Sequence, residues 1–213
     1  MGGEGNTSRG YVIPLIIALL SILVIITGGF IRINDAGESC PDWPKCFDSW
    51  SFDISESEQE TYWNENPEEA DSRGINHRYS TFEIFTEWFH RLLVGVILLP
   101  VCLYNVFRVK NSKIELGPKV HLMSFIVLLL LIIQAIAGAI TVLFDNADWS
   151  VSVHLTLAIL FVSSSIYQSL IWAKDLGKLP ENMHIDQEII VQINKLLNFM
   201  VVSLFSLLFI GAW

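Results

Sequence analysis

Long apolar runs alternate with polar segments along this chain. Runs without Asp, Glu, Lys or Arg cover residues 10–31, 120–144, 149–173 and 196–213, and a fifth apolar segment covers 84–107. A helix rises 1.5 Å per residue, so segments of about 20 residues can cross a hydrocarbon core of about 30 Å. The pattern predicts an all-α, polytopic membrane helix bundle of four antiparallel transmembrane helices plus the start of a fifth.

This pattern divides the chain into five parts. We expect a cytoplasmic N-terminus and the first span over 1–33, an extracytoplasmic acidic loop with a cysteine pair over 34–82, and spans two to four over 83–175. A cytoplasmic linker follows over 176–194, and a fifth span starts over 195–213. The first span is too long for the apolar region of a signal peptide, so we interpret it as a permanent anchor.

Charge is concentrated in one loop. Residues 34–82 hold 12 Asp and Glu against 3 Lys and Arg, which accounts for the whole net charge of −9, and no nucleic-acid partner is expected. Lys and Arg gather instead in the short loops after spans two and four, whereas 144–150 has none. The positive-inside rule then predicts a multi-pass protein of the cell membrane with a cytoplasmic N-terminus. The stretch 53–76 is acidic and poor in aliphatic residues, which predicts a mobile segment.

The second span carries ionisable residues at its outer end. Only 16 uncharged residues separate Arg91 from Arg108, and they cover about 24 Å, so a spanning helix must draw in residues on the N-terminal side. Those residues include Glu87, His90 and Arg91, which share one helical face. Ionisable groups at this depth usually mark function; the alternative is a Glu87–Arg91 ion pair that neutralises itself and leaves His90 unused.

A second histidine lies at a matching depth. His154 falls within the first two turns of the fourth span, counted from the outer face, as His90 does in the second. Either one alone is more often a hydrogen-bonded interior histidine. Two imidazoles on different helices at one depth are what bis-histidine ligation of a haem iron needs, and the pair beside Glu87 favours such a site.

The outer loop contains Cys40 and Cys46, six residues apart with two prolines and a tryptophan between them. On an oxidising face this spacing allows a disulfide, either structural or redox-active. Arg32, at the outer edge of the first span, is either an interfacial anchor or, with Arg91, a partner for haem propionates.

These segments resemble haem A synthase, the membrane enzyme that converts haem O to haem A for terminal oxidases. The matching pieces are Thr27-Gly28-Gly29-Phe30-Ile31-Arg32, Cys40-Pro41-Asp42-Trp43-Pro44-Lys45-Cys46, Glu87-Trp88-Phe89-His90-Arg91, Gln134 to Thr141, and His154-Leu155. The cysteine string and the Glu-x-x-His-Arg string together are specific, whereas the glycine and glutamine pieces are weak alone.

The resemblance implies a fold of two similar four-helix halves, of which this chain is the amino-terminal one. His90 and His154 would then be the iron ligands for the substrate haem O, Glu87 the essential catalytic acid, and Cys40 and Cys46 the outer-loop cysteines. A second half with a haem b cofactor would begin around residue 195, so we expect either a truncated chain or a short form that pairs two copies.

The implied reaction oxidises a porphyrin methyl group to a formyl group by successive hydroxylations, with water as the oxygen source. Haem O synthase and an electron acceptor such as a quinone are the implied partners, together with the lipid bilayer. A desolvated Glu87 could move protons or stabilise a developing cation.

Three alternatives remain open. A bis-histidine membrane cytochrome b that only transfers electrons would need neither Glu87 nor the cysteines, and analysis of extracted haem separates it from the synthase. A quinone-linked membrane thiol oxidase would work without haem, which a visible absorption spectrum decides. A membrane scaffold without chemistry would leave Glu87 and His90 unexplained.

Overall fold

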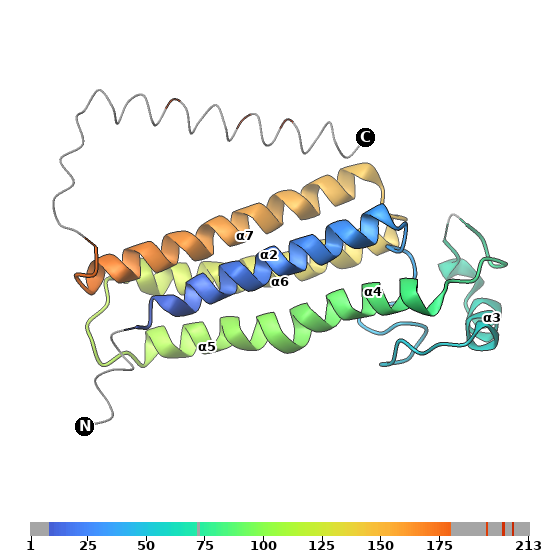
Figure 1. Ribbon diagram of the computed structural model, residues 1–213, viewed down its shortest axis with the longest axis horizontal. Coiled ribbons are helices and arrows are strands. Elements are labelled where there is room, and N and C mark those ends of the chain that lie inside the picture. Colours follow the sequence, from blue (N-terminus) through green and yellow to red (C-terminus); the bar gives the residue numbers. More distant parts are fainter. Residues whose placement is uncertain (1–8, 72, 180–194, 196–201, 203–205, 207–213) are drawn as a thin grey trace.

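The computed structural model describes residues 9–71 and 73–179, together with the isolated positions 195, 202 and 206. Within these residues, four helical segments are long and apolar enough to cross a membrane: α2 (Val12–Ile33), the segment Thr81–Lys110, α6 (Pro118–Leu143) and α7 (Asp148–Asp175). They lie side by side as one bundle (Figure 1). The predicted all-α bundle with four spans is therefore confirmed. The fifth span expected over 195–213 lies outside the described residues, apart from the three isolated positions.

The bundle core is apolar and draws on every span. α7 packs against α6 and α2, and α5 (Leu99–Lys110) packs against α6. The buried side chains that meet between them are Ile17, Leu98, Cys102, Val127, Leu131 and Phe161. Large apolar side chains also point outward, and Leu19, Ile26 and Leu122 are each 60% exposed or slightly more. An apolar outer face of this extent suits a lipid environment, and the backbone groups in the interior of each helix are paired within that helix.

The second span changes its winding halfway. It consists of α4 (Thr81–Leu92), the π-helical turn η2 (Leu93–Leu98) and α5. Pro100 lies in the first turn of α5 and has no N–H to donate to the preceding turn, which favours the wider winding before it. The extra residue in such a turn changes the face that each half presents. α4 packs against α2, whereas α5 also reaches α6.

The acidic stretch is folded, so the prediction of a mobile segment over 53–76 was wrong. It contains α3 (Glu56–Glu65) and the 3-10 turn η1 (Pro67–Glu69). Ser55 and Glu58 form a reciprocal capping box at the start of α3, which satisfies two otherwise unpaired N–H groups. Trp63 is 2% exposed, and the Gln59 amide exchanges two hydrogen bonds of 2.9 Å with the backbone of Tyr79.

A small second core joins this region to the bundle. Its buried members are Cys40, Cys46, Phe47, Ile54, Trp63, Tyr79 and Ile84. Ile84 belongs to α4, so the cysteine loop and α3 are fixed directly onto the start of the second span. We call this the Cys-loop end of the bundle, and the candidate site lies there.

Candidate functional site

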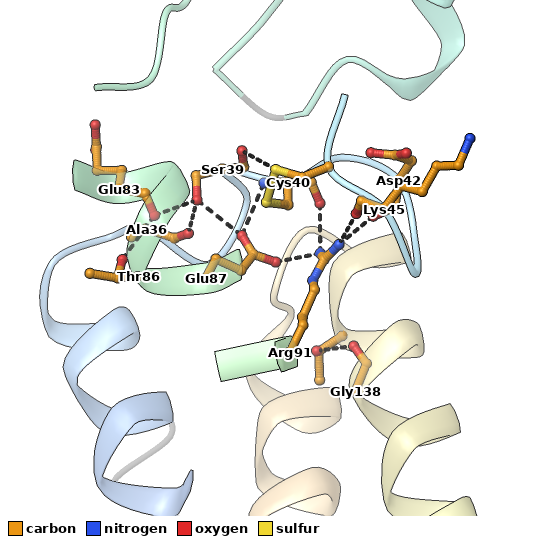
Figure 2. A network of polar contacts seen from close by, with 12 residues as sticks. Ala36, Ser39, Cys40, Asp42, Lys45, Glu83, Thr86, Glu87, Arg91 and Gly138 are labelled. Carbon is orange, nitrogen blue, oxygen red and sulfur yellow. Dashed lines mark hydrogen bonds and ion pairs between the residues drawn. A yellow bond between two sulfur atoms is a disulfide. The ribbon is translucent and has the colours of Figure 1, made fainter. Parts of the chain in front are cut away.

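Glu87 lies buried at the Cys-loop end of α4, with 5% of its surface exposed. A capping box between Ser80 and Glu83 starts this helix, and Glu87 follows four residues after Glu83. One carboxylate oxygen, Oε2, accepts the backbone N–H of Cys40 at 3.0 Å and lies 3.1 Å from the Ser39 hydroxyl (Figure 2). The other, Oε1, pairs with the Arg91 guanidinium at 2.5 Å. The carboxylate thus faces the cysteine loop and has a partner on each side.

Arg91 ties the same loop to α4. Its guanidinium donates to the backbone carbonyl oxygens of Cys40 at 2.7 Å and Lys45 at 2.6 Å, and also to that of Asp42. With Glu87, these acceptors use four of its five N–H groups (Figure 2). The Glu87–Arg91 ion pair that the sequence offered as the alternative to a functional site is present. The pairing of Arg91 with a haem propionate stays a prediction, and these contacts do not support it.

Cys40 and Cys46 form the disulfide that the spacing allows. Both residues are fully buried, and the Cys46–Ser49 backbone bridge closes the loop behind them. Because the backbone N–H and carbonyl of Cys40 bond Glu87 and Arg91, the loop that the disulfide closes is held by the charged pair. The choice between a structural and a redox role stays open.

The His90 ring lies one turn from Glu87 on α4 and faces α2. Its Nδ1 is 3.0 Å from the Thr27 hydroxyl, and the Val24 carbonyl also interacts with the ring. The ring edge packs against Gly28, where a Cβ would stand 3.2 Å from His90 Cε1. Gly28 therefore admits the imidazole, whereas no described atom lies within 4 Å of such a Cβ at the adjacent Gly29. Of this glycine pair, Gly28 alone makes room for a side chain of the neighbouring helix.

The His154 ring, in the second turn of α7, has a similar setting against α6. A Cβ at Gly138 would stand 3.1 Å from His154 Cε1. The Gln134 amide nitrogen lies 3.3 Å from His154 Nε2 and donates to the His154 backbone carbonyl at 2.9 Å. His154 Nδ1 and Gln134 Oε1 are buried and have no hydrogen-bond partner among the described residues.

These observations bring the two predicted ligands toward one region. Both rings lie at the Cys-loop end of the bundle, His90 on α4 against α2 and His154 on α7 against α6, and each packs against a glycine of the neighbouring helix. Two neutral imidazoles are the donor set that a bis-histidine haem iron takes. The room that Gly28 and Gly138 leave for the two rings suits this arrangement, so these residues could hold a haem.

Arg32 lies apart from this pair. Its guanidinium forms an ion pair with Asp148 at 3.0 Å and donates to the Asn146 carbonyl at 3.3 Å. Both charged side chains are roughly half exposed. Arg32 thus fastens the end of α2 to the turn between α6 and α7, and its expected propionate pairing also stays a prediction without support from these contacts.

An apolar pocket of about 210 Å³ opens between α2 and α4. It is lined by Ile26, Thr27, Phe30, Phe85, Thr86 and Phe89. Thr27 belongs to this lining and also contacts the His90 ring. The pocket can therefore take a hydrocarbon group close to the histidine.

Sequence reasoning missed the contacts of three residues of this site: Ser39 beside Glu87, Thr27 beside His90, and Gln134 beside His154. Ser39 directly precedes Cys40, but no pattern marks a serine in a loop as the neighbour of a carboxylate 48 residues away. For Thr27 a signal existed, because a threonine beside a glycine pair on a spanning helix is a polar group next to an opening.

Comparison with known proteins gives an independent result. The profile of the COX15-CtaA family, described as cytochrome oxidase assembly protein, matches residues 11–213. A protein named "Heme A synthase" from Lysinibacillus sphaericus is 25% identical over 151 residues, which cover 70% of this chain and 40% of the relative. Another "Heme A synthase", from Shewanella oneidensis, is 30% identical over 138 residues, which cover 64% and 38%. The chain thus spans about two fifths of the length of these curated relatives. No solved structure matches it.

Proposed function

Because this chain belongs to the COX15-CtaA family of cytochrome oxidase assembly proteins, we propose that it acts in haem A synthesis. The reaction is the oxidation of the haem O methyl group to a formyl group, with water as the oxygen source. In balance, R–CH3 and H2O give R–CHO, four protons and four electrons. The electrons go to an acceptor such as a quinone, and the product serves terminal oxidase assembly.

One observation carries this proposal. Two partly buried imidazoles from α4 and α7 lie at the Cys-loop end, with a buried carboxylate one helical turn from His90. His90 and His154 would hold the iron of the substrate haem O. The apolar pocket beside Thr27 would accept part of its hydrocarbon side chain. A haem b cofactor would belong to the second half of the fold, which is expected to begin around residue 195.

Glu87 can hold or release a proton without losing its partners. As a carboxylate it accepts from Arg91 and from the Cys40 N–H. The Ser39 hydroxyl has a single proton, yet three acceptors surround it: the Ala36 carbonyl, the Glu83 carbonyl and Glu87 Oε2. When Ser39 donates to a carbonyl, a protonated Glu87 can donate to Ser39. Such a group is suited to taking up protons from the oxidised methyl carbon.

The surroundings of the site follow from the charge pattern. We infer an orientation with the N-terminus cytoplasmic and the cysteine loop extracytoplasmic, since Lys and Arg lie in the loops at the opposite end. Haem O synthase is the partner that would supply the substrate. Cys40 and Cys46 would either brace the loop over Glu87 or pass electrons onward.

The test is the conversion of haem O by the Glu87→Gln variant. We expect haem O still to bind, because the histidines are untouched, and haem A to be absent from the extracted pigment. Liquid chromatography of the extracted haem measures both. Wild-type rates of haem A formation in Glu87→Gln would remove the catalytic role of this carboxylate.

A second function, electron transfer by a bis-histidine cytochrome b, is favoured by one contact. Arg91 pairs with Glu87 at 2.5 Å, so the carboxylate can be explained as a structural anchor. The same pigment analysis separates the two functions, because a cytochrome would return its haem unchanged from both the wild-type protein and Glu87→Gln.

A further inference from the structure

The ring of His90 is fixed through its Nδ1. The Thr27 hydroxyl donates its single proton to the Val24 carbonyl at 2.8 Å, as threonines in helices commonly do. Its oxygen can therefore only accept from His90 Nδ1, 3.0 Å away. The Val24 carbonyl, a second acceptor, also interacts with the ring. The proton thus lies on Nδ1, and the lone pair of Nε2 is available to a metal.

His154 has the opposite arrangement. The Gln134 end that faces it is the amide nitrogen, since it donates to the His154 carbonyl at 2.9 Å. Its second N–H points to His154 Nε2 at 3.3 Å and so occupies the lone pair that an iron would need. His154 Nδ1 is buried and forms no well-aligned hydrogen bond within the described part of the chain; its ring interacts with the Gln134 backbone, as the His90 ring does with the Val24 carbonyl, but no hydroxyl corresponds to that of Thr27.

Metal-bound histidines normally donate the other ring N–H to an acceptor, which orients the ring and raises its basicity. His90 has this support from the Thr27 hydroxyl at 3.0 Å, whereas His154 has no such side-chain acceptor at Nδ1 and has the Gln134 amide at Nε2 instead. We propose that the two histidines are unequal ligands: His90 is the fixed one, positioned by Thr27, and His154 is the exchangeable one, restrained by Gln134. This inference rests on the proposed haem site, and it describes which iron ligand is exchanged when a substrate haem binds and leaves.

The inequality has a functional consequence. A cofactor can stay bound through two firm ligands, but a substrate must be taken up and its product released in every cycle. With His90 fixed, only the bond to His154 has to form and break. When the bond from iron to His154 is open, the Gln134 amide can donate to His154 Nε2 instead. This lowers the free-energy cost of leaving that ring nitrogen without a partner.

The first experiment is titration of the purified full chain with haemin, followed by visible absorption and magnetic circular dichroism. We expect His154→Ala to keep haemin in a high-spin, five-coordinate form through His90. We expect His90→Ala to lose tight binding. Equal loss in both variants, or retention only in His90→Ala, would overturn the inequality.

The second experiment changes the positioning residues. Thr27→Val keeps the shape and removes the acceptor, so haemin affinity should fall about 10- to 100-fold. Gln134→Leu frees His154 Nε2, so cyanide should displace this ligand more slowly than in the wild-type protein. The matched control is Thr141→Val, because the Thr141 hydroxyl also bonds one turn back within its helix, to the Gly138 carbonyl, and not to either ring. An unchanged affinity in Thr27→Val would contradict the proposal.

These measurements are independent of the proposed reaction. If haemin binds unequally but haem O is never converted, the inequality stands and haem A synthesis falls. If haem A forms while both histidines bind haemin equally, haem A synthesis stands and the proposed inequality is wrong.

Discussion

Removing the Arg91 charge should detach the cysteine loop from α4. Arg91→Met keeps a similar length but leaves Glu87, which is 5% exposed, as a buried carboxylate without its ion-pair partner. Removing one partner of a buried pair costs about 3–5 kcal/mol. Glu87→Gln is milder, because Arg91 keeps its three loop carbonyls, and the loss of one charge-assisted hydrogen bond costs about 1.5–3 kcal/mol.

The double variant isolates the pair. When Glu87→Gln is combined with Arg91→Met, no uncompensated charge remains, and the amide oxygen introduced at position 87 can still accept from the Cys40 N–H. The cost of the double variant should therefore be smaller than the sum of the single costs by about 1.5–3 kcal/mol. Lys45→Ala is the matched control in the same loop, because Lys45 pairs with Asp48 at the surface, and such a pair contributes about 0–1 kcal/mol.

Hydrogen exchange of backbone groups in the cysteine loop measures the free-energy cost of each variant. The backbone N–H groups of Cys46 and Ser49 bond each other's carbonyls at 2.9 and 3.0 Å, so their exchange reports opening of the loop. The four proteins of the cycle would be compared in one detergent at one pH. Additivity within about 0.5 kcal/mol would refute the reasoning, and so would a cost for Arg91→Met no larger than that of Lys45→Ala.

Two further predictions follow from close contacts. Gly28→Ala and Gly138→Ala place a Cβ 3.2 and 3.1 Å from the neighbouring imidazole carbon, so both should weaken haemin binding in a spectroscopic titration; Gly29→Ala, whose Cβ would have no described atom within 4 Å, should leave it unchanged. Burial and the charge of Asp71 raise the pKa of Glu38 above its ordinary 4.5, so its contribution to loop stability is complete below that value and is lost as pH rises through the folded pKa. Hydrogen exchange at increasing pH should show this loss in the wild-type protein and a flatter profile in Glu38→Gln.

The spans and the ligand candidates could be predicted because they depend on local properties. A run of apolar residues long enough to cross a bilayer is visible without any tertiary contact. The shared face of Glu87, His90 and Arg91 needs only helical periodicity, and all three lie before the π-helical turn that shifts the rest of the span. Thus the altered winding left this prediction intact.

The acidic stretch was misjudged because its composition outweighed a local signal for a helix start and concealed a tertiary contact. Few aliphatic residues suggested that 53–76 could not bury enough surface to fold. Yet Ser55 and Glu58 stand at the spacing of a capping box, and α3 buries Gln59 and Trp63 on the cysteine loop side. The amide of Gln59 satisfies backbone groups of Tyr79, 20 residues away, which no local pattern can reveal.

The loop partners of Arg91 escaped prediction for the same reason, and this changes how Glu87 is understood. An i, i+4 pair suggested either self-neutralisation or a site, as if the two were exclusive. In the structure the pair is not self-contained: Arg91 binds loop carbonyls 46 to 51 residues away, and Glu87 binds the backbone of Cys40. His90 is adjacent to Arg91 and one turn from Glu87, so the contacts that neutralise the charges also fix α4, and with it the ligand, to the disulfide loop. An anchoring role and a place in the site are therefore compatible, and the single variant Glu87→Gln will disturb both unless loop exchange and haem conversion are measured on the same protein.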